Sequence, residues 1–309
     1  MIKQIILPLL ILSSQIASAQ LVTFGTDSNQ FSMDFVTIGN PGNAADTTGA
    51  PNPVGAVAYT YQIGKYEVSR DMILKATSAG SLGITLQDMT SYGGNGANRP
   101  ATGVSWNEAA RFVNWLNTSK GYQAAYNFTT SGANDNITLW GAGQYSGSNP
   151  FRHKNAIYVL PTLDEWYKAA YGSPSGTWYN YPTGSDSIPT AVTGGTLLNT
   201  AVYNGQSGPA DLTNAGGLSP YGTMVQGGNV WEWNETAYDG SNNSASEGRE
   251  LRGGVWGGGS NALDASYRPN SVPSNEYFNY GFRVASVPEP GSASLVILGL
   301  AAVLARRRR

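Results

Sequence analysis

The sequence contains the stretch Gly228-Asn229-Val230-Trp231-Glu232-Trp233, in which a carboxylate stands between two tryptophans. Large aromatic side chains dominate protein cores, so we expect both tryptophans to be buried. An acidic group among buried rings needs a partner, because an isolated buried charge costs much free energy. Glu232 is therefore predicted to bind either nearby backbone donors or an ion.

Three helices are predicted before this stretch. Ser69 can cap the first, which is expected over about residues 70–76. The other two begin with capping boxes, in which a hydroxyl and a glutamate three residues later satisfy orphan backbone N–H groups. The boxes are the pairs Ser105 with Glu108 and Thr162 with Glu165. Apolar residues at helical spacing predict the buried faces, which comprise Ala109, Phe112, Val113 and Leu116 in the second helix and Trp166, Ala169 and Ala170 in the third.

The remaining segments are weakly periodic and rich in Gly, Ser, Thr and Asn, as in ordered loops and short strands. Residues 40–43 read as a turn, and alternation predicts a half-buried strand over residues 58–63. Two late strands are predicted at residues 253–256 and 280–284, on either side of a long loop. Because no repeat or Pro/Ser linker divides the chain, we predict an α+β fold in a single irregular, loop-rich domain at residues 20–286.

Five short sequence blocks occur in a fixed order along the chain, and together they indicate a family more specifically than any single block does. They are IGKYEVS (63–69), RPATGVSWNEAA (99–110), LPTLDEW (160–166), GNVWEW (228–233) and RGGVW with GFR (252–256 and 281–283). Over about residues 35–285 this series resembles the domain of the sulfatase-modifying factor, or formylglycine-generating enzyme, family. The resemblance implies the family's variant of the C-type lectin fold. Arg252 and Arg283 are expected to brace loops through carboxylates or carbonyls.

The resemblance also implies a chemistry that depends on cysteine. Enzymes of this family oxidise a cysteine of a client sulfatase with copper, which a pair of cysteines holds between the last two motifs. The present sequence contains no cysteine, and thiolates are the ligands that select Cu(I). We therefore expect no copper and no formylglycine-generating activity.

Other catalytic centres are weakly indicated. His153 is the only histidine, which excludes zinc or iron sites built from several histidines, and its segment reads as a loop rather than as part of a catalytic triad. A hydrolase with two carboxylates stays open, although no spacing identifies an acid and a base among Glu67, Asp164, Glu232 and Glu235. With 12% charged residues and a net charge of −2, the chain does not resemble a nucleic-acid-binding protein.

Calcium is the metal that the resemblance implies. Family members bind it around the GNVWEW block with loop carbonyls and side-chain oxygens, and such hard ligands suit the ion. Carried over to this sequence, the ligands are the carbonyls of Gly228 and Val230 and the carboxylate of Glu232, and Asn204 aligns with the family's other calcium site. Val225 stands where the family usually has Asn or Asp, so we expect the site to be weakened or lost.

The long loop at residues 257–280 is the best candidate for a ligand-binding surface. Tyr, Asn, Ser and Gly are the residues of adaptable recognition loops, and relatives of this fold display variable ligand-binding residues in this region. The candidate residues are Trp256, Tyr267, Arg268, Asn270, Asn275, Tyr277 and Phe278. We therefore predict a non-catalytic module that binds a glycan or a peptide. A divergent oxidoreductase or hydrolase and a purely structural matrix protein are the alternatives.

Both ends of the chain predict export. Residues 1–19 combine Lys3, a short apolar run and a small-x-small ending, which is typical of a signal peptide that signal peptidase removes before Gln20. Residues 287–309 begin with VPEP, continue with a short apolar transmembrane segment at 295–304 and end in four arginines. This tail resembles the PEP-CTERM sorting signal of Gram-negative bacteria. The resemblance implies transient anchoring in the inner membrane, removal by an exosortase, and delivery to the cell surface or extracellular matrix.

Overall fold

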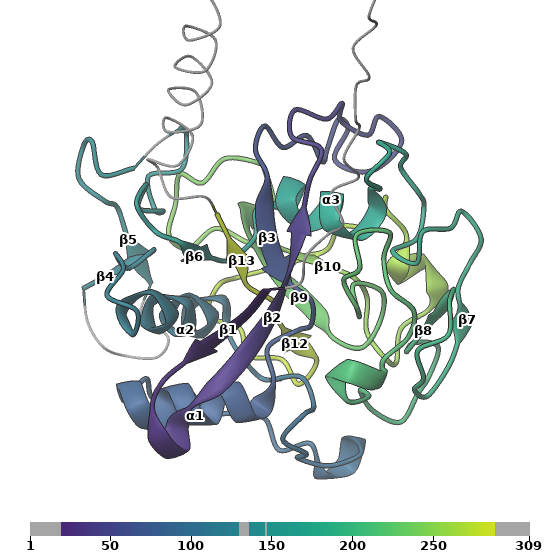
Figure 1. Ribbon diagram of the computed structural model, residues 1–309, viewed down its shortest axis with the longest axis horizontal. Coiled ribbons are helices and arrows are strands. Elements are labelled where there is room, and N and C mark those ends of the chain that lie inside the picture. The colour runs from purple at the N-terminus through teal and green to yellow at the C-terminus, as the bar shows by residue number, and fades with distance from the viewer. Residues whose placement is uncertain (1–19, 130–135, 146, 288–309) are drawn as a thin grey trace, which may run out of the picture.

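The computed structural model describes residues 20–129, 136–145 and 147–287. The predicted signal peptide and the sorting segment from residue 288 onward lie outside these residues. Within the described ranges, two principal sheets and three α-helices surround a buried core (Figure 1). The domain boundaries at residues 20 and 286 stay predictions.

The larger sheet joins the two ends of the domain. Its strand order is β1-β2-β3-β13-β6, and every neighbouring pair is antiparallel. Ala285 is paired with both Ile63 and Val159, so the last strand lies between two earlier ones (Figure 1). The strands are β1 Gln20–Phe24, β2 Phe31–Ile38, β3 Tyr61–Gly64, β6 Tyr158–Val159 and β13 Ala285–Ser286.

In the second sheet, strands from three of the sequence blocks are paired at Glu232. Its strand order is β11-β10-β9-β12. Glu232 in β9 is paired with Arg252 of the antiparallel β10 and with Gly281 of the parallel β12. The blocks GNVWEW, RGGVW and GFR therefore meet in this sheet. The strands are β9 Trp231–Ala237, β10 Arg249–Arg252, β11 Asn270–Ser271 and β12 Tyr280–Gly281.

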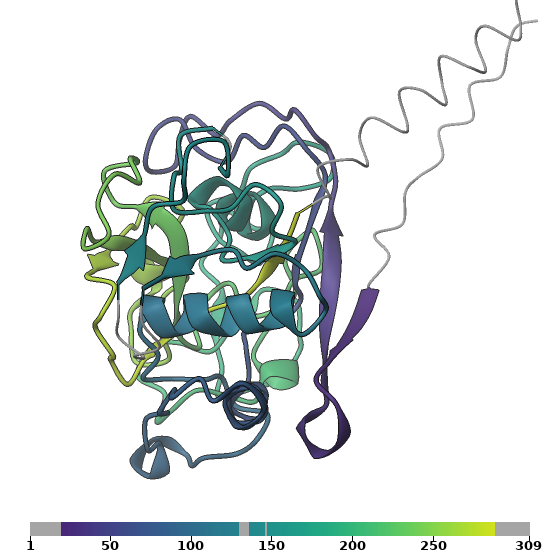
Figure 2. The same cartoon turned by 90° about the vertical axis from the view of Figure 1, so that its left-hand side faces the viewer.

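The three predicted helices are present, namely α1 Arg70–Gly80, α2 Trp106–Thr118 and α3 Leu163–Tyr171. The Ser69 hydroxyl caps α1, which extends to Gly80 rather than ending near residue 76. Both capping boxes are confirmed at the starts of α2 and α3, and the predicted apolar faces are buried. Figure 2 shows α2 along one side of the domain, with α1 beneath it and the hairpin of β1 and β2 at the edge.

Three strand predictions were wrong in extent. Residues 58–60 are exposed and precede β3 instead of belonging to it. Strand β10 ends at Arg252, because Gly253 and Gly254 adopt left-handed φ angles of +96° and +85° that no strand contains. Residues 282–284 are not a strand but a fully buried crossing from β12 in one sheet to β13 in the other. Tertiary connections, rather than local preference, ended these strands.

The segments around residues 127–149 and 172–218 contain only short pieces of regular structure, as predicted for their described parts. They form two small two-stranded sheets, β4 Asn127–Phe128 with β5 Ile137–Thr138 and β7 Thr190–Ala191 with β8 Thr200–Ala201. The 3-10 helices of the described chain are η1 Asp27–Asn29, η2 Thr90–Tyr92, η3 Leu212–Asn214 and η4 Ser260–Leu263. No helix in the described ranges has the length and apolar character that a membrane span needs. The predicted transmembrane segment at 295–304 falls outside those ranges.

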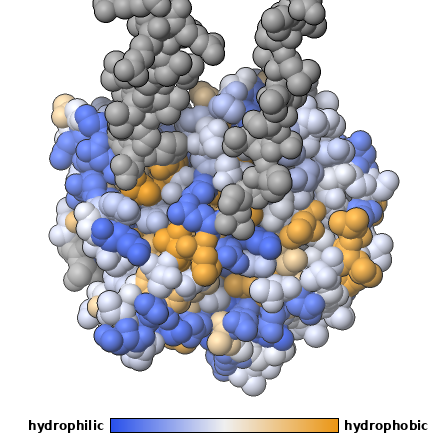
Figure 3. All heavy atoms as spheres, in the orientation of Figure 1, coloured by the Kyte–Doolittle hydropathy of each residue, from blue (hydrophilic) through white to orange (hydrophobic). Residues whose placement is uncertain are grey.

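Exposed apolar side chains do not by themselves identify a binding face. Several large ones are more than half exposed, among them Leu21, Leu197 and Leu198. On the face drawn in Figure 3, the visible hydrophobic side chains form separate patches among hydrophilic ones. Scattered exposure of this kind is normal for a protein surface. A functional site has to be identified from its geometry instead.

Candidate functional site

The carboxylate of Glu232 is bound by side chains from two other sequence blocks. Its Oε1 accepts a hydrogen bond of 2.6 Å from Arg283 Nη2, and its Oε2 accepts bonds of 2.6 Å from Arg283 Nε and from Trp166 Nε1. All three side chains are fully buried. Arg283 also donates hydrogen bonds to the carbonyls of Gly64 and Met224, in agreement with its predicted role of bracing loops through carboxylates or carbonyls. The partners of Glu232 are therefore side chains rather than the predicted backbone donors.

Glu232, the one carboxylate named for calcium, does not fit the ion in this arrangement, whereas the carbonyl ligands of Gly228 and Val230 and the site at Asn204 stay predictions. Both oxygens of Glu232 accept hydrogen bonds from a guanidinium or an indole, and a cation placed there would face the charge of Arg283. Val225 is buried and offers no side-chain oxygen, while Asn204 lies exposed and donates its backbone N–H to Gly258. No group of three or more acidic, His or Cys side chains that could hold a metal occurs in the described part of the chain. The buried arginine supplies the positive charge instead.

A second carboxylate lies beside this ion pair. Glu67 accepts hydrogen bonds from Asn229 Nδ2 at 2.6 Å and from the backbone N–H of Val230 at 3.3 Å. Burial, and then the charge of Glu232, raise the pKa of Glu67 well above its usual range. Asn229 Oδ1 in turn accepts a bond of 2.8 Å from the backbone N–H of Ala210. This network ties the GNVWEW block to the loop that follows β8.

An aromatic face, which we define as Tyr92, Trp256 and Phe278 together with Tyr277, the residue before Phe278, forms where η2 meets the long loop. The rings of Tyr92 and Phe278 are stacked with centroids 5.0 Å apart, and Trp256 contacts both, at 5.8 Å and 5.7 Å. Trp256 is buried, whereas Phe278 is 37% and Tyr277 51% exposed. Tyr92 comes from η2 and was not predicted, because no local pattern links it to residues so distant in the sequence.

The other predicted ligand residues lie elsewhere on the long loop, outside the aromatic face. Tyr267 stacks on Trp231 at 5.9 Å. Arg268 forms an ion pair of 2.7 Å with the buried Glu250, Asn270 belongs to β11, and Asn275 donates to the hydroxyl of Ser271. Only Trp256, Tyr277 and Phe278 of the seven candidates therefore belong to the aromatic face.

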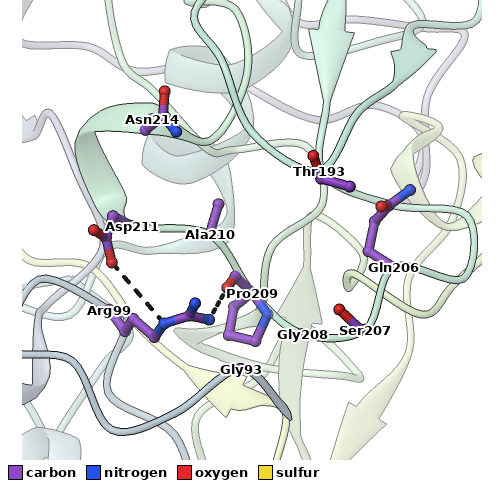
Figure 4. Close-up of a pocket in the computed structure, with 10 residues that line it drawn as sticks. All are labelled: Gly93, Arg99, Thr193, Gln206, Ser207, Gly208, Pro209, Ala210, Asp211 and Asn214. Atoms are coloured by element: carbon purple, nitrogen blue, oxygen red, sulfur yellow. Dashed lines mark hydrogen bonds and ion pairs between the residues drawn. The ribbon is translucent and has the colours of Figure 1, made fainter.

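A polar cavity of about 220 Å³ adjoins this face. Figure 4 shows Arg99 reaching across it, with its guanidinium held between the carbonyl of Pro209 and the carboxylate of Asp211. Gln206 lines the cavity and donates its backbone N–H to the carbonyl of Trp256, and Gly93 of the lining follows Tyr92, so the cavity and the aromatic face are neighbours. The remaining lining residues are Gly93, Thr193, Ser207, Gly208, Ala210 and Asn214.

A larger cavity of about 760 Å³ opens beside the start of α3. Its wall includes Arg152, whose Nη1 lies 3.2 Å from Glu235 Oε2. Burial raises the pKa of Glu235 and of Asp164, and Arg152 partly offsets this rise for Glu235. His153 also lines this cavity, and burial lowers its pKa. Two of the four carboxylates that the sequence left open for a hydrolase therefore share one cavity, while Glu67 and Glu232 lie in the core.

Residues 26–287 match the family described as sulfatase-modifying factor enzyme 1-like domain. The chain belongs to this sulfatase-modifying factor family. Its fold is the C-type-lectin-like variant of the formylglycine-generating enzyme fold. Residues 286–309 match the PEP-CTERM protein-sorting motif, so this family member is exported and is recognised by an exosortase during export.

Two mammalian proteins named inactive C-alpha-formylglycine-generating enzyme 2 are similar to part of this sulfatase-modifying factor domain. The mouse protein (Mus musculus) is 31% identical and the bovine protein (Bos taurus) 30% identical, each over 143 residues. These matches cover 41% of this chain and 42% and 43% of the two relatives. The chain therefore spans less than half the length of the curated relatives that it matches.

Solved structures share the fold of this family member. Treponema denticola variable protein 1 superposes with a TM-score of 0.60 at 21% identity and covers 87% of this chain and 99% of its own. PvdO from Pseudomonas aeruginosa superposes with a TM-score of 0.53 at 17% identity and covers 86% and 98%. At such low identity these similarities show the fold alone.

Proposed function

We propose that the protein is a non-catalytic ligand-binding module of the cell surface or extracellular matrix, and that its aromatic face binds a glycan or a peptide. The observation that carries this proposal is the exposure of Phe278 and Tyr277 although both are held in place by neighbouring rings. Phe278 is stacked on Tyr92, and Tyr277 contacts Tyr280 at 5.0 Å. Aromatic side chains that are fixed before binding lose little conformational entropy when a ligand covers them.

The polar cavity beside the aromatic face supports the same proposal. Binding sites combine apolar contact area with a few polar groups that orient the ligand. Thr193, Ser207 and Gln206 line this cavity and carry hydroxyl and amide groups that can orient a ligand (Figure 4). Arg99 is braced by Pro209 and Asp211, which reduces the entropy that it would lose on binding.

The absence of cysteine supports a role without oxidase chemistry. The copper site and the thiol-exchange step of the family's enzymes both need cysteines, and the sequence has none. The mammalian relatives carry the word inactive in their names. The sorting motif supports delivery to the outside of the cell, where a binding module meets ligands of other cells or of the matrix.

The proposal is tested with glycan and peptide arrays probed with the full chain. The affinity for the best hit is then measured by calorimetry for the wild type and for two variants. We expect Phe278→Ala and Tyr277→Ala to weaken binding by roughly tenfold or more, as truncation of an aromatic anchor does. Tyr122→Ala is the control, since Tyr122 is comparably exposed at 40% but lies outside the aromatic face. Equal affinity of wild type and Phe278→Ala would contradict the proposal.

A divergent hydrolase is the second candidate, and one observation favours it. Asp164 and Glu235 line the larger cavity, and burial raises the pKa of both carboxyl groups. Groups with shifted pKa values in a cavity are candidates for acid–base catalysis. The test is a panel of chromogenic ester and glycoside substrates. Turnover that disappears in Glu235→Gln would support the hydrolase, and absence of turnover for the whole panel would leave the binding module.

A further inference from the structure

The larger cavity lies at the other end of the domain from the aromatic face. It is lined by the segment before β3, by the segment 148–156, by the start of α3, by the end of β9 with the residues that follow it, and by Val287. In Figure 1, α3 lies in the upper half of the domain, whereas η2, which carries Tyr92, is the short blue helix at the lower edge. A volume of about 760 Å³ is within the range of cavities that bind small organic ligands.

One wall of this cavity is a fully engaged network of charges and hydroxyls. Arg152 Nη1 lies 3.2 Å from Glu235 Oε2 and 4.0 Å from Glu165 Oε2. The hydroxyl of Tyr126 donates to Glu235 at 2.8 Å, and that of Tyr59 donates to Glu165 at 2.6 Å. The two buried carboxylates therefore share one guanidinium and are rigidly held. Such a wall can shape a ligand site without itself changing on binding.

Other groups of the lining keep hydrogen-bonding capacity. Asp164 accepts a bond of 2.7 Å from the backbone N–H of Gly55 through Oδ1, which leaves its second oxygen available. Asn149 Nδ2 is buried and has no hydrogen-bond partner among the described residues. Lys154 is exposed and forms no ion pair within them. The cavity thus offers an acceptor from Asp164 and a donor from Lys154, which lie in different segments, whereas the buried Nδ2 of Asn149 is closed to a ligand.

The balance of charge points to an uncharged ligand. Three carboxylates and two cationic side chains line or border the cavity, namely Glu165, Glu235 and Asp164 with Arg152 and Lys154. An anion would face Asp164 and Glu235, and a cation would face Arg152 and Lys154, so either charge meets repulsion. A neutral molecule that carries hydroxyl groups meets no such repulsion and can form hydrogen bonds with Asp164 and Lys154.

Tyr59 adds an aromatic surface to the polar groups that line the cavity. Its side chain is 39% exposed at the cavity, while its hydroxyl is fixed on Glu165 and its ring contacts Tyr61 edge-on at 6.2 Å. Ala56, Val57 and Ala58 continue this wall. A sugar ring presents hydroxyl groups around its rim and C–H groups on its face, so it fits a wall that pairs polar groups with an aromatic ring. We propose that this cavity is a second site, independent of the aromatic face, and that it binds a neutral saccharide of one or two rings.

The test uses the full chain and a panel of glucose, galactose, mannose, N-acetylglucosamine, maltose and cellobiose, with saturation-transfer NMR to detect binding and titration to measure affinity. We expect at least one neutral sugar to bind, and glucuronate and glucosamine to bind less well. Tyr59→Ala should weaken binding at least tenfold, whereas Tyr59→Phe, which keeps the ring, should weaken it by less than threefold. Asp164→Asn, which keeps the acceptor for Gly55 and replaces the free oxygen, should also weaken it.

Controls separate this site from the aromatic face and from loss of folding. Phe278→Ala should leave saccharide affinity unchanged, and a melting curve of each variant shows whether it is folded. Binding of no sugar on the panel, or equal binding by wild type and folded Tyr59→Ala, would overturn the inference. Loss of sugar binding in Phe278→Ala but not in Tyr59→Ala would assign the sugar to the aromatic face and would equally overturn it.

Discussion

At the scale of single residues, the core is organised around an ion pair that is closed off from water. Arg283 contacts both oxygens of Glu232, and its remaining N–H groups are taken by backbone carbonyls. Bidentate pairs of this kind are the strongest charge-assisted hydrogen bonds. Their net effect on stability is small, because burial of both charges is costly, but removal of one partner leaves the other buried without compensation.

We therefore predict that Glu232→Ala lowers the free energy of unfolding by about 3–5 kcal/mol. Urea denaturation measures the change. Asp71→Asn, which removes a partly exposed helical ion pair with Lys75, is the control and should cost less than about 0.5 kcal/mol. Because Arg283 occupies both oxygens of Glu232, we also predict that no metal ion stabilises this site and that EDTA leaves the melting temperature of the wild type unchanged. A clear decrease on chelation, lost in Glu232→Gln, would restore the calcium interpretation, since an ion that binds only the native state stabilises it.

A pH dependence is expected from the capping glutamate of α2. Burial raises the pKa of Glu108 to about 7, nearby Glu276 adds to the rise, and the hydrogen bond from the Ser105 backbone opposes it. Between pH 4.5, the ordinary pKa, and pH 7, the native state then binds more protons than the unfolded chain, so stability falls as pH rises. The contribution of the protonated Glu108 to the free energy of unfolding is fully present below pH 4.5 and is lost above about pH 7.

We predict that Glu108→Gln flattens this part of the profile. Glutamine also completes a capping box but does not ionise, so the variant should gain about 1–3 kcal/mol relative to wild type between pH 4.5 and 8. Denaturation at a series of pH values measures the difference. The exposed Asp239→Asn should keep the wild-type slope. Parallel profiles of wild type and Glu108→Gln would show that the pKa of Glu108 is the same in the native and unfolded states, and would contradict the prediction.

At the scale of secondary-structure elements, close backbone contacts define where β9 begins. Gly228 precedes this strand with φ +85°, and a Cβ at this position would lie 2.2 Å from the carbonyl oxygen of Val202. The backbone of Val202 accepts the N–H of Asn229, so neither segment can move apart without breaking that bond. The glycine is required both by its left-handed conformation and by the space that Val202 occupies.

A pair of substitutions separates these two requirements. Gly222 has φ +89°, but a Cβ at this position would have no neighbouring atom within 4 Å, so Gly222→Ala should cost about 1–2 kcal/mol from conformation alone. Gly228→Ala meets the same strain and a backbone clash, so its loss of stability should be at least twice as large. Thermal melts of both variants measure this. Equal losses of stability in the two variants would mean that the backbone of Val202 shifts to accommodate the added methyl group.

At the scale of the whole molecule, the chain is built so that its two ends meet in one sheet. β1 and β13 belong to the same five-stranded sheet, and the sorting motif starts where β13 ends. The sorting motif is therefore directly continuous in sequence with the last strand of the domain. The two candidate binding sites lie at different ends of this domain, so ligands at one need not obstruct the other (Figure 1).

We predict that the mature protein lacks both end segments. Intact mass of protein released from a host with an exosortase should correspond to a chain that starts at Gln20 and has lost the residues beyond about Val287. A host without the exosortase is the control and should retain the tail. Surface-released protein that still carries Arg306–Arg309 would contradict the sorting prediction.

Local chemistry determined what the sequence could predict. The caps of α1, α2 and α3 and their buried faces depend on residues within one or two turns of each other, so they follow from the sequence directly. The order of five blocks indicated the family, and the lack of cysteine predicts that its copper chemistry is absent. Strand limits were predicted poorly, since left-handed glycines and the crossing between sheets ended them.

Only the tertiary structure decided which distant residues share a site. Glu232 and Arg283 are 51 residues apart, and no spacing indicated that an arginine rather than backbone or calcium would bind the carboxylate. The stacking of Tyr92 on Phe278 and the sharing of Arg152 by Glu165 and Glu235 likewise depend on where loops and strands cross. Chain topology and packing determine such contacts. They bring together side chains that are far apart in the sequence, and the local sequence around one does not indicate the other.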